Sequence, residues 1–310
     1  MNEDPILDAA ARAGWLYYAA GRTQDQIAAD MGISRQRAQR LVSRAMAEGL
    51  IRVRLEHPIA ACMELEARLR ARFDLREVRV APSTGRDPTL SVAPAAAALF
   101  ETILTREEPQ IIGLGTGRAL TAMAAEVQAL PCARHTLVSL IGNIGEDGAA
   151  SRFEVLLRMA TKLGAPHYPM SAPVLTETPE ERDLFLSLPP VRRVRDLATR
   201  ATVLFIGVGQ MGEDAPLKQD GFLMPDELAR LQAEGAMGEV TGHVFDAEGA
   251  YLPTPLADRM TAVRVEPGKD HLAIGVAAGP AKIGALRAAL NGRILNGLVT
   301  DEDTAITLLG

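Results

Sequence analysis

The stretch TQDQIAADMGISRQRAQRLVSRAMA, residues 23–47, carries the start and stop signals of two short helices. Thr23, followed three positions later by Gln26, forms a capping box in which each residue can bond the backbone of the other. A glycine turn at 32–33 follows, and Ser34 is the expected N-cap of a second helix. The spacing predicts two capped helices joined by a tight turn, which is typical of a helix-turn-helix.

The second of these helices is strongly basic. From Ser34 to Arg54 the chain holds six arginines and one acid, Glu48, a local charge of +5. In a helix-turn-helix the second helix lies in the major groove of DNA and offers its first side chains to base edges. Arginine and glutamine form paired hydrogen bonds with guanine and adenine, whereas cations farther along the helix suit phosphates. The residues predicted to contact DNA are Thr23 and Ser34 at the helix starts, Arg35, Gln36 and Arg37 at base edges, and Arg40, Arg44, Arg52 and Arg54 at phosphates. A solvated basic helix in a small bundle is the alternative interpretation.

The flanking segments complete a predicted domain of residues 1–57. Apolar residues recur every three or four positions from Ile6 to Tyr18, which predicts an amphipathic helix. Residues 51–55 alternate like a half-exposed strand, so the predicted domain is winged-helix-like. Residues 58–75 then form a connector, either a helix packed on the rest of the chain or a helix that mediates dimerisation. The second is slightly favoured, because helix-turn-helix proteins commonly bind two half-sites as dimers.

The composition of the whole chain is that of a folded protein with about two domains. Of the 310 residues, 47% are apolar and 23% are charged, which excludes extensive disorder. The net charge of −6 combines +1 in residues 1–57 with −7 in the remainder, so the total hides the basic helix. No run of about 18 uncharged apolar residues is present, and the acidic start is unlike a secretory signal. We predict a cytoplasmic protein with no membrane partner.

The two cysteines, Cys62 and Cys132, have no metal-ligand spacing and are too few for a disulfide scaffold. We therefore predict no metal and no cofactor.

From residue 76 to residue 310, short apolar runs alternate with helical patterns. The predicted strands are Val78–Ala81, Gln110–Leu114, Thr136–Ile141, His167–Met170, Val203–Val208, Gly238–Phe245, Ala262–Val265 and Leu272–Ala277. The predicted helices are Leu90–Leu104, Arg118–Ala129, Ser151–Leu163, Pro179–Leu186, Pro225–Glu234 and Ala281–Leu290. This alternation indicates a doubly wound, mostly parallel α/β sheet with helices on both faces. Ligands of such sheets bind beyond the carboxyl ends of the strands.

The first glycine-rich strand end, IIGLGTGR, runs into a predicted helix. Backbone N–H groups at Gly113, Gly115 and Gly117, together with Thr116 and Arg118, suit a phosphate at the start of that helix. A simple chain reversal is the alternative interpretation of these glycines, and we favour the phosphate site.

Two further strand ends are rich in glycine. The segment LIGNIG contains Asn143, whose amide can donate and accept hydrogen bonds. The segment IGVGQMG, which contains Gln210, matches GxGxxG in form. The residues that follow it, EDAP, do not open a helix and bring acids toward the site, so we predict no dinucleotide there.

Several later side chains are candidates for ligand contact. Glu239 and Asp246 can accept the hydroxyl hydrogens of a polyol, and Lys282, one of four lysines, lies at a predicted helix start where a second cation completes a phosphate site. His243 is a candidate general base, although a histidine between strand residues more often has a structural role. The sequence shows no nucleophile elbow, no metal-spaced His/Cys cluster and no carboxylate pair in a catalytic context.

In this order, the segments resemble the SorC family of sugar-sensing bacterial repressors, which is related to DeoR. The resemblance covers essentially the whole chain. It rests on residues 23–47, GLGTGR at 113–118, GVGQMG at 207–212, GAMGEVTGHVFD at 235–246, GPAK at 279–282 and LVTDEDTA at 298–305.

The resemblance implies an effector domain with a fold like that of sugar-phosphate isomerases and deaminases, which binds a phosphorylated sugar or sugar acid. It implies that Thr116 and Lys282 bind the phosphate and that Glu239 and the Gln210 loop lie near the sugar. It also implies homodimers or homotetramers. Asn143 stands where some relatives carry a lysine, and because an asparagine cannot form a Schiff base, non-covalent binding is expected.

These observations predict a DNA-binding transcriptional regulator, specifically a repressor of a carbohydrate or polyol operon. Its expected partners are double-stranded operator DNA and a sugar phosphate or polyol bound in residues 76–310. The alternative is a sugar-phosphate isomerase or deaminase with an accessory DNA-binding module, in which His243 and Glu239 supply the acid–base chemistry.

Overall fold

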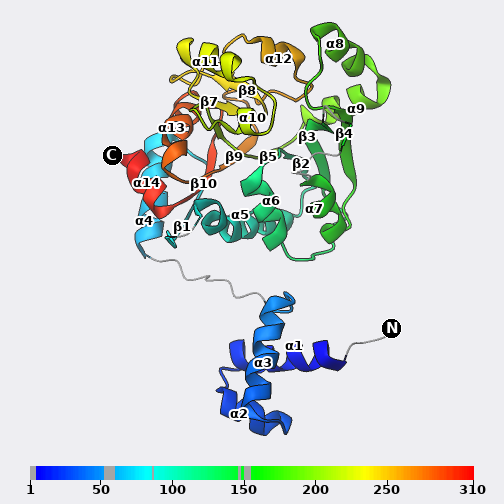
Figure 1. The fold of residues 1–310 in the computed structure, drawn as a ribbon, viewed down its shortest axis with the longest axis vertical. Helices are drawn as coiled ribbons and strands as arrows, with labels where there is room; N and C mark the ends of the chain where they lie inside the picture. Colours follow the sequence, from blue (N-terminus) through cyan, green and yellow to red (C-terminus); the bar gives the residue numbers. More distant parts are fainter. Residues whose placement is uncertain (1–4, 52–59, 86, 146–147, 150–154) are drawn as a thin grey trace. The chain divides into compact units, whose positions relative to one another are not determined.

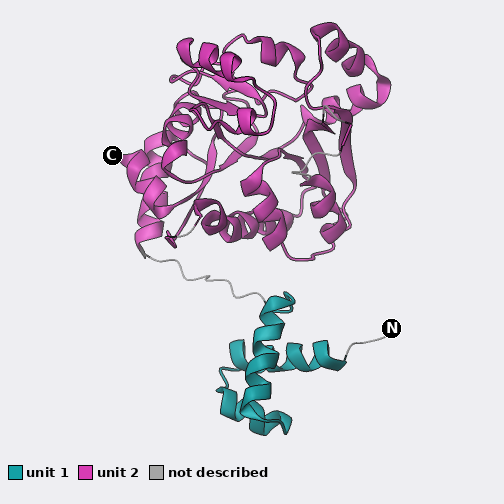
Figure 2. Ribbon diagram, in the orientation of Figure 1, with its two compact units in different colours: residues 1–57 teal, residues 58–310 magenta. Residues whose placement is uncertain are grey.

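The chain divides into two compact units, residues 1–57 and residues 58–310, called here the N-terminal unit and the large unit (Figure 2). The computed structural model describes residues 5–51, 60–85, 87–145, 148–149 and 155–310. Each unit has its own hydrophobic core, so each is described separately.

The N-terminal unit consists of three helices, α1 (Pro5–Tyr18), α2 (Gln24–Met31) and α3 (Arg35–Ala47). The capping box is present: the Thr23 backbone N–H donates to Gln26 Oε1 at 2.9 Å, and Gln26 N–H donates to Thr23 Oγ1 at 3.3 Å. Gly32 ends α2 with a φ of 64°, which favours glycine. Ser34 Oγ then accepts from Arg37 N–H at 3.3 Å and starts α3. The local caps therefore set the turn between the two helices.

The core of the N-terminal unit depends on small residues that let α1 and α3 approach closely. A Cβ atom at Gly14 would lie 2.5 Å from Ile51 Cδ1 and 2.8 Å from Ala45 Cβ, so only glycine fits there. Ile27 from α2 and Ala38 from α3 are fully buried beside this contact. The unit is thus packed from all three helices.

The large unit is built on a seven-stranded sheet in which every pair of neighbouring strands is parallel. The strand order is β1-β10-β9-β5-β2-β3-β4 (Figure 1). The strands are β1 (Glu77–Ala81), β2 (Ile111–Leu114), β3 (Thr136–Ile144), β4 (His167–Pro173), β5 (Val203–Ile206), β9 (Leu272–Val276) and β10 (Gly297–Asp301). The predicted mostly parallel sheet is confirmed.

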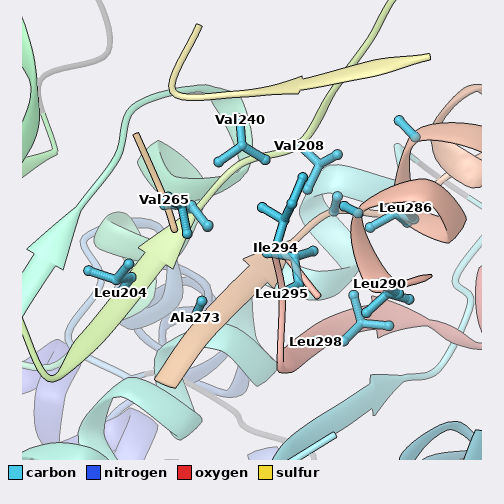
Figure 3. Close-up of a cluster of buried hydrophobic side chains, with 14 of the residues drawn as sticks. Leu204, Val208, Val240, Val265, Ala273, Leu286, Leu290, Ile294, Leu295 and Leu298 are labelled. Carbon is cyan, nitrogen blue, oxygen red and sulfur yellow. The ribbon is translucent and has the colours of Figure 1, made fainter. Parts of the chain in front are cut away.

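Helices cover both faces of this sheet, and the central strands are buried on both sides as such a sheet requires. Side chains alternate along β5: Leu204 joins the core beneath α4, α9, α13 and α14, whereas Phe205 joins the core beneath α5, α6 and α7. Figure 3 shows the first of these cores, in which Leu204, Leu286 and Leu298 belong to one cluster of buried side chains. The covering helices are α4 (Ala60–Phe73), α5 (Pro88–Leu104), α6 (Arg118–Glu126), α7 (Leu156–Leu163), α9 (Pro189–Ala198), α13 (Ile283–Asn291) and α14 (Glu302–Leu309).

A smaller antiparallel sheet, with strand order β6-β7-β8, lies above the carboxyl ends of the main strands. It packs with three short helices around a third apolar cluster that includes Met211, Leu228 and Met260. Its elements are β6 (Gly209–Gln210), β7 (Gly238–Val240), β8 (His243–Phe245), α10 (Pro216–Gln219), α11 (Pro225–Ala233) and α12 (Pro255–Arg259), with α8 (Pro179–Ser187) nearby.

Two predicted strands are wrong. The run Gly238–Phe245 is not one strand but the hairpin β7–β8, because Thr241 and Gly242 turn the chain with φ values of 51° and 78°. Ala262–Val265 is buried for the most part but forms no ladder with a described strand. Strands β6 and β10 and helices α9, α10, α12 and α14 are not among the predicted elements, and the prediction that EDAP opens no helix is wrong, because the short helix α10 begins at Pro216. The start of the helix predicted over Ser151–Leu163 and most of the strand predicted over 51–55 lie outside the described residues, and α7 begins at Leu156.

Helix α4 occupies most of the predicted connector. It packs on β1 and α14, and Cys62, Leu65 and Leu69 are buried in the first core of the large unit. Glu66 Oε1 also accepts a hydrogen bond from Val80 N–H of β1 at 2.9 Å. Of the two predicted interpretations, the structure shows the helix packed on the large unit.

Candidate functional site

A cavity of about 580 Å³ opens at the carboxyl ends of the main strands. Its walls include the loops that follow β2, β5 and β9, namely residues 115–118, 207–209 and 276–278. Because the central strands are parallel, their carboxyl ends meet at one edge and bring these distant loops together. This volume is in the range that holds a small organic ligand. We call it the first cavity.

The loop between β2 and α6 supplies one wall. Gly115, Thr116, Gly117 and Arg118 all line the first cavity. Gly117 has a φ of 119°, which favours glycine, and its carbonyl accepts from Thr121 N–H at 2.9 Å, so α6 begins at the cavity. A helix start with such a loop suits an anion, since the first N–H groups of a helix have no intrahelical partner.

Gly113, predicted with this loop, does not line the cavity. It lies inside β2, where a Cβ atom would lie 2.6 Å from Leu204 Cδ2 and 2.8 Å from Leu140 Cδ2. The close packing of neighbouring side chains, not a ligand, explains the glycine there.

Two opposite charges meet at the first cavity, Glu239 from β7 and Lys282 from the short 3-10 helix η1 (Pro280–Lys282). Glu239 Oε2 accepts from Gly242 N–H at 2.8 Å. Burial raises the pKa of Glu239, against this hydrogen bond and the charge of Lys282, which both lower it. Burial likewise lowers the pKa of Lys282, against the charge of Glu239. Each group therefore stabilises the charged form of the other in a poorly solvated wall.

Gly209 makes room for this carboxylate. Gly209 and Glu239 are directly opposite each other in the β6–β7 pair, and a Cβ atom at Gly209 would lie 2.0 Å from Glu239 Oε1. The glycine at position 209 of the GVGQMG segment is thus explained by the space that the Glu239 side chain needs to reach the first cavity.

Gln210, the predicted contact in the same segment, is buried but is not among the residues that line the first cavity. Its amide donates from Nε2 to Asp214 Oδ1 at 2.8 Å, and its Oε1 accepts from Gly212 N–H. Gln210 therefore stabilises the loop after β6 through these two hydrogen bonds.

Arg118 connects the glycine loop to the segment around α10. Its Nη2 donates to Gln219 Oε1 at 3.2 Å and lies 3.4 Å from Asp220 Oδ1. Gln219, Asp220 and Phe222 all line the first cavity. No pattern in the sequence indicates these residues, because the contact joins positions about a hundred residues apart.

Asn143 and Asp246, both predicted contacts, do not line the first cavity. Asn143 lies near the end of β3 between two residues that do, Ile141 and Gly145, and its buried Oδ1 has no hydrogen-bond partner among the described residues. Asp246 Oδ1 accepts from Glu248 N–H at 3.1 Å and Ala250 N–H at 2.8 Å, so it holds a turn.

The structure separates His243 from Glu239. In the hairpin, Glu239 is opposite Val244 and Val240 is opposite His243, so the two side chains leave opposite faces. Glu239 lines the first cavity, whereas His243 lines another one. Burial lowers the pKa of His243 to about 4. The acid–base pair of the enzyme alternative is therefore not assembled.

The described basic residues of α3 lie on its exposed side. Arg35, Gln36, Arg37, Arg40 and Arg44 are exposed, while Ala38, Leu41, Val42 and Ala45 face the core. Arg35 lies 3.5 Å from Asp25 and Arg44 lies 3.4 Å from Glu48, in exposed ion pairs of small energetic weight. Arg52 and Arg54 lie outside the described residues.

Residues 57–310 match the Sugar-bind family of sugar-binding domains. The chain belongs to this family. It is 33% identical over 303 residues to the erythritol catabolism regulatory protein EryD of Brucella abortus (strain 2308), a match that covers 97% of this chain and 96% of EryD. It is 28% identical over 318 residues to the transcriptional regulator LsrR of Enterobacter sp. (strain 638), covering 100% of this chain and 94% of LsrR.

A solved structure extends the similarity to the whole fold. The full-length sorbitol operon regulator SorC of Klebsiella pneumoniae superimposes with a TM-score of 0.77 at 26% identity, covering 100% of both chains. The predicted SorC-type family is confirmed, and the relatives are transcriptional regulators. They do not favour the enzyme alternative.

Two further features bear on partners. Over the residues that the structure describes, no helix is long and apolar enough to cross a membrane. Within the same residues, no group of three or more His, Cys, Asp or Glu side chains is placed to hold a metal ion.

Proposed function

We propose that this protein binds operator DNA through its N-terminal unit and represses a carbohydrate or polyol operon until a small effector occupies the first cavity. The observation that carries the proposal is the first cavity itself. In a chain of the sugar-binding family, it joins a glycine loop, Lys282 and the partly buried Glu239 at the carboxyl edge of the sheet. A phosphate or a polyhydroxylated body fits this chemistry.

The effector contacts follow from charge and hydrogen-bonding type. The loop Gly115–Arg118 and Lys282 present N–H groups and a cation to a phosphate or another oxyanion. Glu239 accepts hydrogen bonds from hydroxyl groups, and Phe222 with Leu217 lines an apolar part of the wall. Because the EryD relative is a regulator of erythritol catabolism, four-carbon polyols and their phosphates are the first effectors to test. Binding is non-covalent and needs no cofactor.

The DNA contacts follow from the exposed face of α3. A capped helix after a glycine turn is the geometry of a helix-turn-helix, in which Arg35, Gln36 and Arg37 meet base edges. Arg40 and Arg44, farther along the helix, suit phosphates. Arg52 and Arg54 remain predicted phosphate contacts, and Thr23 and Ser34 place the helix starts near DNA.

Regulation requires that the effector bind the DNA-competent and DNA-incompetent arrangements with different affinity. A homodimer or homotetramer would position two N-terminal units on two half-sites. We place the coupling between effector and DNA in the segment 58–75 that follows the N-terminal unit. This division into a DNA-binding unit, a connecting segment and an effector unit from residue 76 is part of the proposal.

A thermal-shift screen of erythritol, other free sugars and polyols, and their phosphates tests the effector assignment. A ligand at a hundred times its Kd stabilises the folded state by about 2.7 kcal/mol and raises the unfolding midpoint. We expect Lys282→Met to weaken a phosphorylated effector on the order of 10–100-fold while operator binding without effector stays unchanged. The exposed Arg230→Met variant is the matched control. If the wild type, Lys282→Met and Arg230→Met proteins bind the effector with equal affinity, Lys282 is not part of the effector site.

Operator binding tests the DNA assignment. We expect Arg37→Ala to reduce the preference for operator over random DNA by about 1–3 kcal/mol, as the loss of one paired base contact does. An equal loss on both DNAs would show that Arg37 contacts phosphate and not a base.

A further inference from the structure

A second cavity, of about 640 Å³, lies on the other side of the β7–β8 hairpin from the first. Its walls come from α8 and α9, from the hairpin residue His243 and from the segment 251–271. Apart from His243, the candidate general base of the enzyme alternative, none of its residues was among the predicted site residues. The proposed function assigns this second cavity no role.

The second cavity is positively charged within an acidic part of the chain. Four cations line it, Arg182, Arg195, Arg264 and Lys269, against two acids, Asp258 and Glu266. The pKa values of His243 and His271 are both lowered by burial, so neither adds positive charge at neutral pH. The lining residues sum to +2, or to +1 with Asp183, which is paired with Arg182, against −7 for residues 58–310 as a whole.

Two of the cations are held by backbone carbonyls instead of carboxylates. Arg195 Nη1 donates to the carbonyl oxygens of Thr261 and Ala262, the latter at 3.1 Å, and Lys269 Nζ donates to Thr199 O at 2.7 Å. Neither forms an ion pair with a carboxylate in the described part of the chain within 4.0 Å. Carbonyls orient these cations without neutralising them, and a guanidinium or ammonium has further N–H donors.

Like charges also face each other here. Burial, and then the nearby charge of Arg182, lower the pKa of Arg195. Arg182 itself forms an ion pair with Asp183, with 2.7 Å between Nη2 and Oδ1, and the charge of Asp196 partly offsets these effects on the pKa of Arg195. An anionic ligand beside Arg195 would favour the charged form of this partly buried guanidinium.

The third cation is oriented by an aromatic ring. The Arg264 guanidinium lies 5.4 Å from the centroid of Tyr251, and Glu266 lies 3.2 Å from Arg264 Nη2. The Tyr251 hydroxyl donates to Val265 O at 2.9 Å, and His243 meets the same ring edge-on at 6.1 Å. Fixed donors of this kind lose little conformational entropy when they bind an oxyanion.

Apolar side chains form the rest of the wall, among them Leu140, Leu204, Val263 and Met260. This combination of a few oriented cations with an apolar wall matches an organic molecule that carries an anionic group. Arg182 is paired with Asp183 and Arg264 with Glu266, which leaves Arg195 and Lys269 as two lining cations with no ion pair among the described residues. Two such cations match a molecule with two negative charges, such as a phosphate ester near neutral pH.

We propose that the second cavity binds a small organic dianion, a phosphate ester or a dicarboxylate, between Arg195, Arg264 and Lys269. This site is distinct from the first cavity, and its existence does not rest on the proposed function.

The two cavities share a wall, which gives the second site a regulatory consequence. Met260 lines both, and the hairpin places Glu239 in one and His243 in the other. The hydroxyl of Thr241, which lines the first cavity, also donates at 3.0 Å to the carbonyl of Val263, which lines the second. An anion in the second cavity therefore changes the affinity of the first for its effector. This consequence, unlike the site itself, rests on the proposed function.

Calorimetric titration of the full chain with sn-glycerol 3-phosphate and with succinate tests the site. The titration is run in the Lys282→Met protein, so that the first cavity contributes little. We expect at least one probe to bind, and Arg264→Gln with Lys269→Gln in the same background to weaken it about tenfold or more. Which probe binds more tightly decides between phosphate ester and dicarboxylate. Arg230→Gln, which changes an exposed arginine of α11, is the matched control.

Histidine NMR gives a second readout that a loss of folding would not mimic. The chain has five histidines, and the ring signals of His243, assigned with His243→Gln, should shift when the probe binds to the Lys282→Met protein. If the double substitution lowers the thermal midpoint, the same measurements are made with Lys269→Gln alone, because Lys269 is exposed.

The proposal is overturned if neither probe binds at millimolar concentration, or if binding is unchanged by the substitutions and leaves the His243 signals in place. Binding that responds to Lys269→Gln without altering effector affinity in the wild-type chain would support the site and overturn its coupling to the first cavity.

Discussion

The substitution Gly209→Ala should disrupt the first cavity through a single contact. Gly209 lacks a positive φ, so its backbone accepts an alanine without strain. The added Cβ atom would nevertheless lie 2.0 Å from Glu239 Oε1 and 2.7 Å from its Cδ and Cγ atoms. Glu239 must then move, and the hydrogen bond that it accepts from Gly242 N–H must break or lengthen.

The magnitude follows from these two effects. Forcing an extra methyl into a packed site costs about 1–3 kcal/mol. Losing a hydrogen bond to a charged group costs about 1.5–3 kcal/mol. Since a displaced carboxylate regains some solvent, we expect the free energy of unfolding to fall by about 2–4 kcal/mol in total. Effector affinity should fall as well, because the same carboxylate lines the cavity.

Urea denaturation of four proteins checks this reasoning: wild type, Gly209→Ala, Glu239→Ala and the double variant. When the side chain at 239 is already alanine, the three atoms nearest to the added methyl are gone, so Gly209→Ala should cost less than about 1 kcal/mol in that background. If Gly209→Ala costs the same free energy in both backgrounds, the contact with Glu239 is not the reason for the glycine.

Three further predictions concern stability. Because burial raises the pKa of Glu239, the contribution of this residue to the free energy of unfolding declines as pH rises above 4.5. Glu239→Gln should remove this decline, which urea titrations at several pH values would measure. His243, with its pKa lowered to about 4, should destabilise the fold as pH falls from 6.5 toward 4, by on the order of 2–3 kcal/mol, and His243→Gln should abolish this loss. Lys162 Nζ donates to three carbonyls at the end of α6 at 2.7–2.8 Å, so Lys162→Met should lower the free energy of unfolding by about 1.5–3 kcal/mol and the thermal midpoint with it; an unchanged midpoint would contradict the capping role.

The sequence predicted those elements whose signals are local. The caps at Thr23 and Ser34 depend on residues three positions away, so both helices could be predicted from one short stretch. The buried strands could be predicted from short apolar runs such as Val203–Ile206, because both faces of a parallel sheet are covered.

The wrong strands share a physical cause. Gly238–Phe245 is predicted as one strand, but Thr241 and Gly242 reverse the chain within it. Ala262–Val265 is apolar because it packs under the small sheet, and its Val263 N–H bonds Leu140 O without forming a ladder. Burial alone therefore does not separate a strand from a packed loop.

For the first cavity, the sequence could identify residue types but not their orientation. Thr116, Arg118, Glu239 and Lys282 could be proposed because each stands at a strand or helix end with suitable chemistry. Asp246 is equally suitable in type, but its carboxylate accepts a hydrogen bond from the backbone of its own turn. Contacts between distant segments, such as the one from Arg118 to Asp220, leave no pattern in a single sequence.

The strand order has a consequence for how the protein is made. The first cavity draws residues from Thr89 to Lys282, and β10, between β1 and β9, completes the sheet only at Asp301. The N-terminal unit, in contrast, is complete by residue 57 and leaves the ribosome first. A chain cut short by a premature stop codon would therefore keep the unit that we propose binds DNA and lose the response to effector. Nonsense mutations late in the gene should yield proteins that bind DNA but do not respond to the effector. Deletions of equal length from the N-terminal unit should yield proteins that do not bind DNA.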